Sequence, residues 1–155
     1  HISPALGSLR ALEGLNFGGN LLEDNGMCGL IDAVRECSEL KLLDVSRNNL
    51  GPSCVKQLTL RLAVHTSKFT HLSLAHNDVG DGAAALAALL MYNKPASLRV
   101  CDLSFCGVSD AGVRELSAAV PACSSLQSIM LRGTFMSPTA IIAFVEAVSA
   151  HQAKY

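Results

Sequence analysis

A short pattern recurs five times along this chain at almost constant spacing. It approximates Leu-x-x-Leu-x-Leu-x-x-Asn-x-Leu, and its copies begin at residues 12, 40, 69, 98 and 126, in steps of 28 or 29 residues. A single copy would carry little information, because many half-buried strands have alternating leucines. Five copies at one period indicate that one structural unit is stacked on itself to build a continuous core.

Each unit is predicted to contain a strand followed by a helix. In the second copy, Leu43 and Val45 are expected to point inward and Leu42, Asp44 and Ser46 outward. Later in each repeat, residues spaced four apart share one helix face. These sets are Gly26, Leu30 and Val34; Cys54, Leu58 and Leu62; Leu86 and Leu90; Gly112, Leu116 and Val120; and Ala140, Phe144 and Val148. Capping residues predict helix starts near Asp24 or Asn25, Pro52 and Ser53, Asp81, Ser109 and Asp110, and Ser137 and Pro138.

A strand, a turn and a full helix within 28 or 29 residues resemble the long leucine-rich repeats of the ribonuclease-inhibitor-like family. The resemblance runs from Leu12 to the C-terminus. It implies an α/β fold: a right-handed solenoid, or horseshoe arc, of about five repeats, with a parallel β-sheet on the concave face and α-helices on the convex face. Residues 1–155 would form a single domain, in which residues 1–11 end a preceding repeat or cap the first one. Because the chain begins with His1, we expect a fragment of a longer protein.

Several polar and sulfur-containing residues are predicted to be structural. In the family, the asparagine that follows the strand faces inward and bonds to the turn, a role we expect for Asn20, Asn48 and Asn77 because buried backbone groups need partners. Cys106 and Thr134 take this position in the last two repeats. The six cysteines include no Cys-x-x-Cys pair. We interpret them, Cys37 and Cys123 included, as reduced, buried thiols, which predicts a reducing, cytoplasmic environment.

Composition argues against several functions. The formal net charge is −1, and the sequence has neither a basic run nor an apolar stretch of membrane-spanning length. We therefore expect no nucleic-acid or membrane partner. No arrangement of nucleophile, base and acid is visible, and the glycines lack the phosphate-loop spacing. His71 and His76 lack the convergent ligands of a zinc site. We predict a protein that is not an enzyme and uses no metal or cofactor.

The outward strand and turn positions form the candidate binding surface. Arg47, His76 and Phe105 occupy the same turn position in successive repeats, and should form a cationic and aromatic strip of the kind enriched in binding hot spots. Asp44 and Asp102 give the sheet a mildly acidic floor. The predicted partner-binding residues are Asp44, Arg47, His71, His76, Asp102, Phe105, Met130 and Arg132. The alternative is that single exposed hydrophobic residues are ordinary surface, and that Phe135 or Met136 plugs the last repeat.

Three functions fit this sequence. The first is a module that binds another protein on its concave sheet and adjoining turns, within a larger intracellular scaffold or sensor. The second is self-association through the C-terminal end, in a cytoskeletal or flagellar assembly, because Leu131, Ile142 and Phe144 are expected to be partly exposed there. The third is a regulator of the GTPase-activating type, which would need an exposed arginine such as Arg47 or Arg132.

Overall fold

Five strands alternate with helices along the chain. The computed structural model describes residues 10–65, 68–92 and 97–154. The elements are β1 (Gly14–Asn16), α2 (Glu23–Glu36), β2 (Leu42–Asp44), α3 (Pro52–His65), β3 (His71–Ser73), the 3₁₀ turn η1 (Gly80–Gly82), α4 (Ala83–Tyr92), β4 (Val100–Asp102), α5 (Asp110–Ala119), the 3₁₀ turn η2 (Val120–Ala122), β5 (Ser128–Met130) and α6 (Pro138–Gln152). Each strand lies inside one copy of the sequence pattern. The helical turn expected within residues 1–11 lies mostly outside the described residues.

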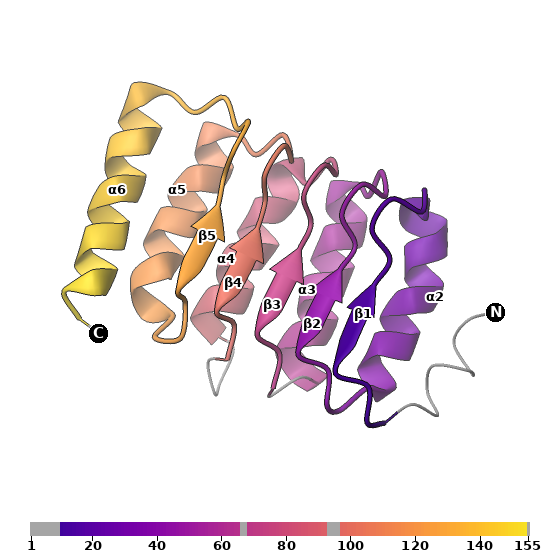
Figure 1. Ribbon diagram of the computed structural model, residues 1–155. Coiled ribbons are helices and arrows are strands. Elements are labelled where there is room, and N and C mark those ends of the chain that lie inside the picture. The colour runs from indigo at the N-terminus through magenta and orange to yellow at the C-terminus, as the bar shows by residue number, and fades with distance from the viewer. Residues whose placement is uncertain (1–9, 66–67, 93–96, 155) are drawn as a thin grey trace.

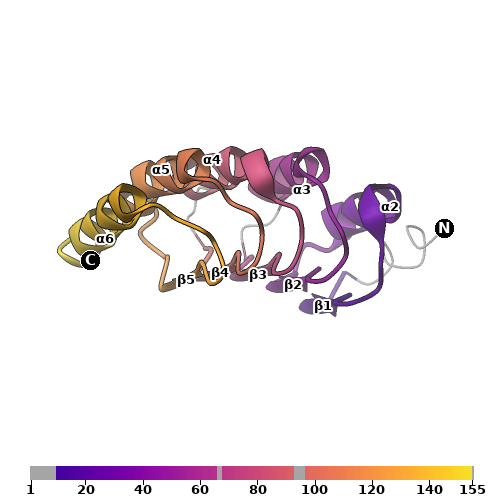
Figure 2. The ribbon, with the colours of Figure 1, turned by 90° about the horizontal axis from the view of Figure 1, so that it is seen from above.

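The strands form one parallel sheet in the order β1-β2-β3-β4-β5. Equivalent repeat positions are paired, so Leu43 lies between Leu15 and Leu72, and Cys101 between Leu72 and Ile129. Parallel neighbours need a crossover connection, which the helices provide. Figures 1 and 2 show that the helices cover one face of the sheet and run along the outer side of a bend, while the strands lie on its inner side. Among the described helices, none has the length and hydrophobicity to cross a membrane.

The core lies between the sheet and the helices. The inward strand residues Leu43 and Val45 are buried, while Leu42 is exposed, as the alternation predicts. Most predicted helix faces are confirmed, since their residues in α3, α4 and α5 are buried. The prediction for α2 is wrong at Gly26, which is exposed. Met27 takes the buried place beside Leu30, because its long side chain fills space that glycine leaves empty.

The predicted helix starts are confirmed in α3, α5 and α6. Ser109 Oγ accepts a hydrogen bond from Gly112 N, and Ser137 Oγ accepts one from Ala140 N, both at 3.3 Å. In contrast, α2 begins at Glu23 after Leu22, which makes no side-chain cap bond. The start expected at Asp24 or Asn25 is therefore wrong. The carboxylate of Asp24 instead accepts from Gly51 N at 2.8 Å, in the next repeat. Asp81 lies in η1, and α4 begins two residues later.

The asparagines and cysteines follow their predicted places with two exceptions. Asn48 and Asn77 are buried. Asn20 bonds to its turn as predicted, since its Nδ2 donates to Phe17 O at 2.8 Å, but it is exposed because β1 is the edge strand of the described sheet. Five of the six cysteines are buried, whereas Cys28 is exposed; it follows the buried Met27 by one residue on α2, and therefore points away from the core. The cysteines form no disulfide among the described residues.

Candidate interaction site

The inner face of the sheet carries a shallow hollow of about 220 Å³. Four of the predicted site residues line it: Asp44, His71, Asp102 and Met130. The sheet register places Asp44 and Asp102 in one row with Met130, and His71 at the start of β3. The structure therefore brings these four residues together as the floor of the concave surface.

The two floor aspartates also have a structural role that the sequence analysis missed. Asp44 Oδ1 accepts a hydrogen bond from Ser46 N, and Asp102 Oδ1 accepts one from Ser104 N, each at 2.9 Å. Such bonds to an amide two residues later define an Asx turn, which ends a strand. The Asp-x-Ser spacing in both repeats was the available signal. The acidic floor is thus partly engaged in shaping its own backbone.

Arg47, His76 and Phe105 follow the carboxyl-terminal ends of β2, β3 and β4 and form a continuous stack there, which we call the rim ladder. Arg47 Nη2 lies 3.4 Å from His76 Nε2. Because a guanidinium only donates, Nε2 is the acceptor in this contact. The His76 and Phe105 rings are stacked, with centroids 4.6 Å apart and planes inclined by 12°. All three side chains are exposed, Phe105 by 48% of its surface.

Backbone bonds between repeats hold the rim ladder in place. Arg47 N donates to Ala75 O at 2.9 Å, and His76 N donates to Ser104 O at 2.8 Å. Phe105 N donates to Arg132 O at 2.6 Å. Each ladder residue is therefore held by the next repeat, which sets the spacing of the three side chains.

The rim ladder occupies a backbone position that favours glycine. Arg47, His76 and Phe105 have φ values of 55°, 57° and 57°, in the left-handed region. The same position in the first and last repeats is Gly19 and Gly133, with φ of 74° and 65°. A left-handed conformation costs a residue with a side chain about 1 kcal/mol. The three central repeats therefore carry large exposed side chains at a conformational cost.

Gly133 occupies the position that follows Phe105 in the next repeat, and its lack of a side chain leaves room for the Phe105 ring. A Cβ atom at Gly133 would lie 2.3 Å from Cδ1 of the Phe105 ring, so any larger residue there would displace the ring from its present position. The exposed Arg132 precedes Gly133 and lies at the same edge of the sheet. The eight predicted residues thus form two adjacent groups, the floor and the rim ladder with Arg132.

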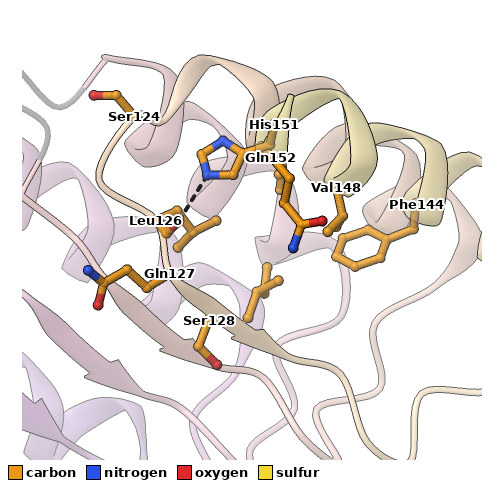
Figure 3. A pocket seen from close by; sticks show the side chains of 10 residues that line it. Ser124, Leu126, Gln127, Ser128, Phe144, Val148, His151 and Gln152 are labelled. Carbon is orange, nitrogen blue, oxygen red and sulfur yellow. Dashed lines mark hydrogen bonds between the residues drawn. The ribbon is translucent and has the colours of Figure 1, made fainter. Parts of the chain in front are cut away.

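A larger hollow, about 660 Å³, lies between β5 and α6. Its lining includes Ile129, Phe144, Val148 and His151. Figure 3 shows the contact between His151 and Leu126, in which His151 Nε2 lies 2.9 Å from Leu126 O. The buried His151 was not singled out from the sequence, because no spacing rule marks it. The expected partial exposure at this end is confirmed: Leu131 and Phe144 are half-buried, and Ile142 is exposed by 58%.

Comparison with a protein-family model identifies leucine-rich repeats in this chain. The model described as "Leucine Rich repeat" matches residues 65–87 and 94–117. These two segments contain β3 and the first half of α4, and β4 with most of α5. The repeat pattern seen in the sequence is therefore of the leucine-rich type.

The names of several curated relatives refer to leucine-rich repeats. Human leucine-rich repeat-containing protein 73 is 30% identical over 142 residues, which are 88% of this chain and 44% of that protein. Bovine NACHT, LRR and PYD domains-containing protein 9 is 27% identical over 133 residues, 84% of this chain and 13% of that protein. Bovine Tonsoku-like protein is 28% identical over 159 residues, 97% of this chain and 12% of its own length. The chain spans less than half of each of these relatives.

Two solved structures share the fold. The tropomodulin C-terminal domain of Caenorhabditis elegans matches with a TM-score of 0.73 at 15% identity, covering 99% of this chain and 94% of that one. The structure titled Leiomodin-1 Actin-Binding Site 2 matches with a TM-score of 0.75 at 14% identity, covering 97% and 87%. These likenesses support the α/β fold, in which a five-stranded parallel sheet is combined with helices.

Proposed function

We propose that this chain, which carries leucine-rich repeats, is a protein-interaction module rather than an enzyme. It holds a partner protein on the inner face of its sheet and on the adjoining turns, within a larger cytoplasmic scaffold or sensor. The rim ladder is the observation that carries this proposal, because it presents stacked, exposed side chains at positions where the backbone favours glycine. Arginine and aromatic residues are the types most enriched in binding hot spots.

The proposed architecture is a right-handed solenoid of the ribonuclease-inhibitor type, with residues 1–155 as one domain. The repeat step of 28 or 29 residues supports the subtype. The handedness follows from the connections, since crossovers between parallel neighbouring strands are right-handed in nearly all proteins. The strands then line a concave surface, which is the part of such proteins that offers an extended binding area.

The proposed site selects its partner by three kinds of interaction. Arg47 and Arg132 attract carboxylate groups at the rim, and the stacked rings of His76 and Phe105 receive planar or apolar side chains. Asp44 and Asp102 accept hydrogen bonds from donors at the floor. With a net charge of −1, the chain lacks the excess positive charge that nucleic acid or an anionic membrane would require.

The glycine substitutions Arg47→Gly, His76→Gly and Phe105→Gly, made together, test this proposal. They remove the three side chains and relieve the left-handed strain, so the chain should keep its circular dichroism spectrum and unfold within about 1 kcal/mol of wild type. Affinity capture from cell extract with quantitative mass spectrometry should then recover a partner with wild type and lose it with the variant. Arg114→Ala with Glu115→Ala, both exposed on α5, is the matched control. A partner retained by the folded glycine variant would place the binding site elsewhere.

A second candidate function is self-association in a cytoskeletal assembly. The hollow between β5 and α6, with the exposed Phe135 and Ile142 near it in sequence, supports this alternative. The match to a leiomodin-1 structure titled as an actin-binding site adds actin as a candidate partner. Sedimentation velocity over a concentration series would detect self-association, which Ile142→Glu should abolish, and cosedimentation with filaments tests actin. A chain that stays monomeric and does not pellet with actin would remove this candidate.

A further inference from the structure

The charge of Asp44 and Asp102 is not needed for the turns that these residues shape. Asn16 occupies the same position in the first repeat, and its Oδ1 accepts a hydrogen bond from Gly18 N at 2.9 Å. Asp44 and Asp102 accept the equivalent bond at the same distance of 2.9 Å. An uncharged amide oxygen therefore serves this turn as well as a carboxylate does. The two aspartates add negative charge to the inner face of the sheet that the backbone does not require.

The hollow of about 220 Å³ on the inner face, which we call the floor hollow, is lined by two carboxylates and by no lysine or arginine. Asp44 and Asp102 are half-buried, and His71 is the other ionisable residue of the lining. Arg47 and Arg132 lie at the rim, outside this lining. Among the residues that the structure describes, no ion pair joins either aspartate to a cation. Because charges in a partly buried site are screened less than charges in open solvent, the floor hollow favours a positively charged group.

The two aspartates flank Ser73 in one row across the sheet. Neighbouring strands lie about 4.8 Å apart, so the backbone positions of Asp44 and Asp102 are separated by about 10 Å. A cation that contacts both carboxylates from above Ser73 must therefore offer donors in more than one direction. The guanidinium group of arginine carries several N–H donors in one plane, whereas the ammonium group of lysine is a compact charge. The geometry of this row therefore favours arginine.

Apolar side chains line the floor hollow next to this row. Leu42 and Val100 lie on either side of His71, two residues before the aspartates on β2 and β4. Leu42 is exposed by 40% although it is apolar. The methylene groups of an arginine pack on such a surface while the charged end of the side chain stays with polar groups. Figure 2 shows the strands on the inner side of the bend, so a long side chain would reach the floor hollow from inside the arc.

We infer that the floor hollow binds an arginine side chain of the partner protein. The guanidinium group of this arginine lies over Ser73 and donates hydrogen bonds to Asp44 on one side and to Asp102 on the other. Its methylene groups pack on Leu42 and Val100. The inference rests on the proposed function, because it names a residue of the partner that binds the inner face of the sheet. Arginine is also one of the residue types that contribute most to binding at protein interfaces.

Selection from a displayed library of short random peptides tests the inference directly. Peptides that bind the wild-type chain are kept, and those that also bind the double variant Asp44→Asn with Asp102→Asn, called the floor variant, are removed. The remaining peptides should share an arginine. Replacing this arginine with citrulline, which has nearly the same shape but no charge, should weaken binding at least about tenfold in fluorescence anisotropy, and lysine should weaken it at least about threefold. An empty selection, peptides without a shared arginine, or equal binding of the lysine peptide would overturn the inference.

Matched variants separate the charge of the floor hollow from the charge of the whole chain. The floor variant keeps its turns, as Asn16 shows, so its circular dichroism and thermal unfolding should match those of wild type. Asp44→Asn alone and Asp102→Asn alone should each weaken the arginine peptide, because the guanidinium contacts both carboxylates. Glu115→Gln with Glu146→Gln, at exposed positions of α5 and α6, changes the net charge as the floor variant does and should leave the affinity within about twofold. Equal weakening by the two double variants would overturn the inference.

Capture of a partner by the floor variant and by the glycine variant of the rim ladder distinguishes this inference from the proposed function. A partner that is lost by the glycine variant but retained by the floor variant would leave the proposed function standing and overturn the inference. Arginine peptides that need Asp44 and Asp102, together with a partner that does not need the rim ladder, would support the inference and count against the rim ladder. The two proposals therefore fail or succeed separately.

Discussion

Asn48 and Asn77 each satisfy backbone groups in two neighbouring repeats. Asn48 Oδ1 accepts from Asn20 N and Leu22 N at 3.1 Å, and its Nδ2 donates to carbonyl oxygens in its own repeat and in the preceding one. Asn77 Oδ1 accepts from Asn48 N and Leu50 N at 3.0 Å. The asparagine amide is the smallest side chain that offers both an acceptor and two donors for these bonds. A single residue thus joins one repeat to the next.

Replacing Asn48 with alanine should destabilise the chain by roughly 3 kcal/mol, because several buried backbone groups lose their partner. Asn20→Ala should cost less than about 1 kcal/mol, because Asn20 is exposed and its released carbonyl can bond water. Urea denaturation of both variants measures the difference. Equal losses of unfolding free energy would mean that burial does not determine how much each asparagine stabilises the chain.

The buried thiols should react slowly in the folded chain. Burial raises the pKa of Cys101 to about 12 and that of Cys106 to about 11, from an ordinary value of 9.0, so little reactive thiolate forms near neutral pH. Cys28 is exposed. A time course with Ellman's reagent at pH 8 should give one fast thiol, and guanidinium should release the others. Loss of the fast phase in Cys28→Ser is the control; several fast thiols without denaturant would contradict the burial.

Helices α4 and α5 approach closely at a glycine. A Cβ atom at Gly112 would lie 2.9 Å from Cβ of Ala83 and 2.9 Å from Cγ1 of Val108. Gly112→Ala should therefore destabilise the chain by about 1–2 kcal/mol, although alanine is the better helix former. Gly29→Ala on α2 is the matched control, since no atom lies within 4 Å, and it should stabilise by up to about 1 kcal/mol. Opposite signs in thermal unfolding are expected; a stabilising Gly112→Ala would show that the helices move apart freely.

Asp110 links the start of α5 to the start of α6. Its Oδ1 accepts from Ser137 N at 2.9 Å, and hydrogen bonds from Ser137 hold the pKa of the carboxyl below its ordinary value of 3.8. A lowered pKa contributes stability that is present above the ordinary value and is lost as pH falls through the folded value. Wild type should therefore lose more thermal stability between pH 7 and pH 3 than Asp110→Asn, which does not titrate. Parallel pH profiles for the two chains would contradict this link.

The last repeat is less well packed than the central ones. Ile129 and Phe144 are half-buried, whereas Leu43 and Leu72, at the strand position of Ile129 in other repeats, are buried. In a stack of repeats each unit is stabilised by its neighbours, so local opening should be easiest where one neighbour is absent from the described sheet. Amide hydrogen exchange should be faster in β5 and α6 than in β2 and β3. Uniform protection would indicate that the stack opens as one unit.

Much of the site could be located by counting residues. Equivalent residues of successive repeats lie on neighbouring strands. The spacing alone therefore predicts that Asp44 and Asp102 share one row across the sheet and that Arg47 and His76 share another. The failed predictions concern local exceptions. Asn20 and Cys28 match the repeat pattern and the buried-thiol rule, yet their exposure depends on which neighbour covers them.

The repeat could be read from the sequence, and so could the order and register of the strands and the residues that face outward, because these follow from a constant period and from alternation along a strand. The packing of the repeats was needed to show that Arg47, His76 and Phe105 stack in contact, that Gly133 makes room for Phe105, and that α3 and α4 leave a groove. A period specifies which residues are neighbours, but it does not specify how their side chains touch. The left-handed turns, the rotamers and the helix separations that set their contacts arise when the repeats pack together.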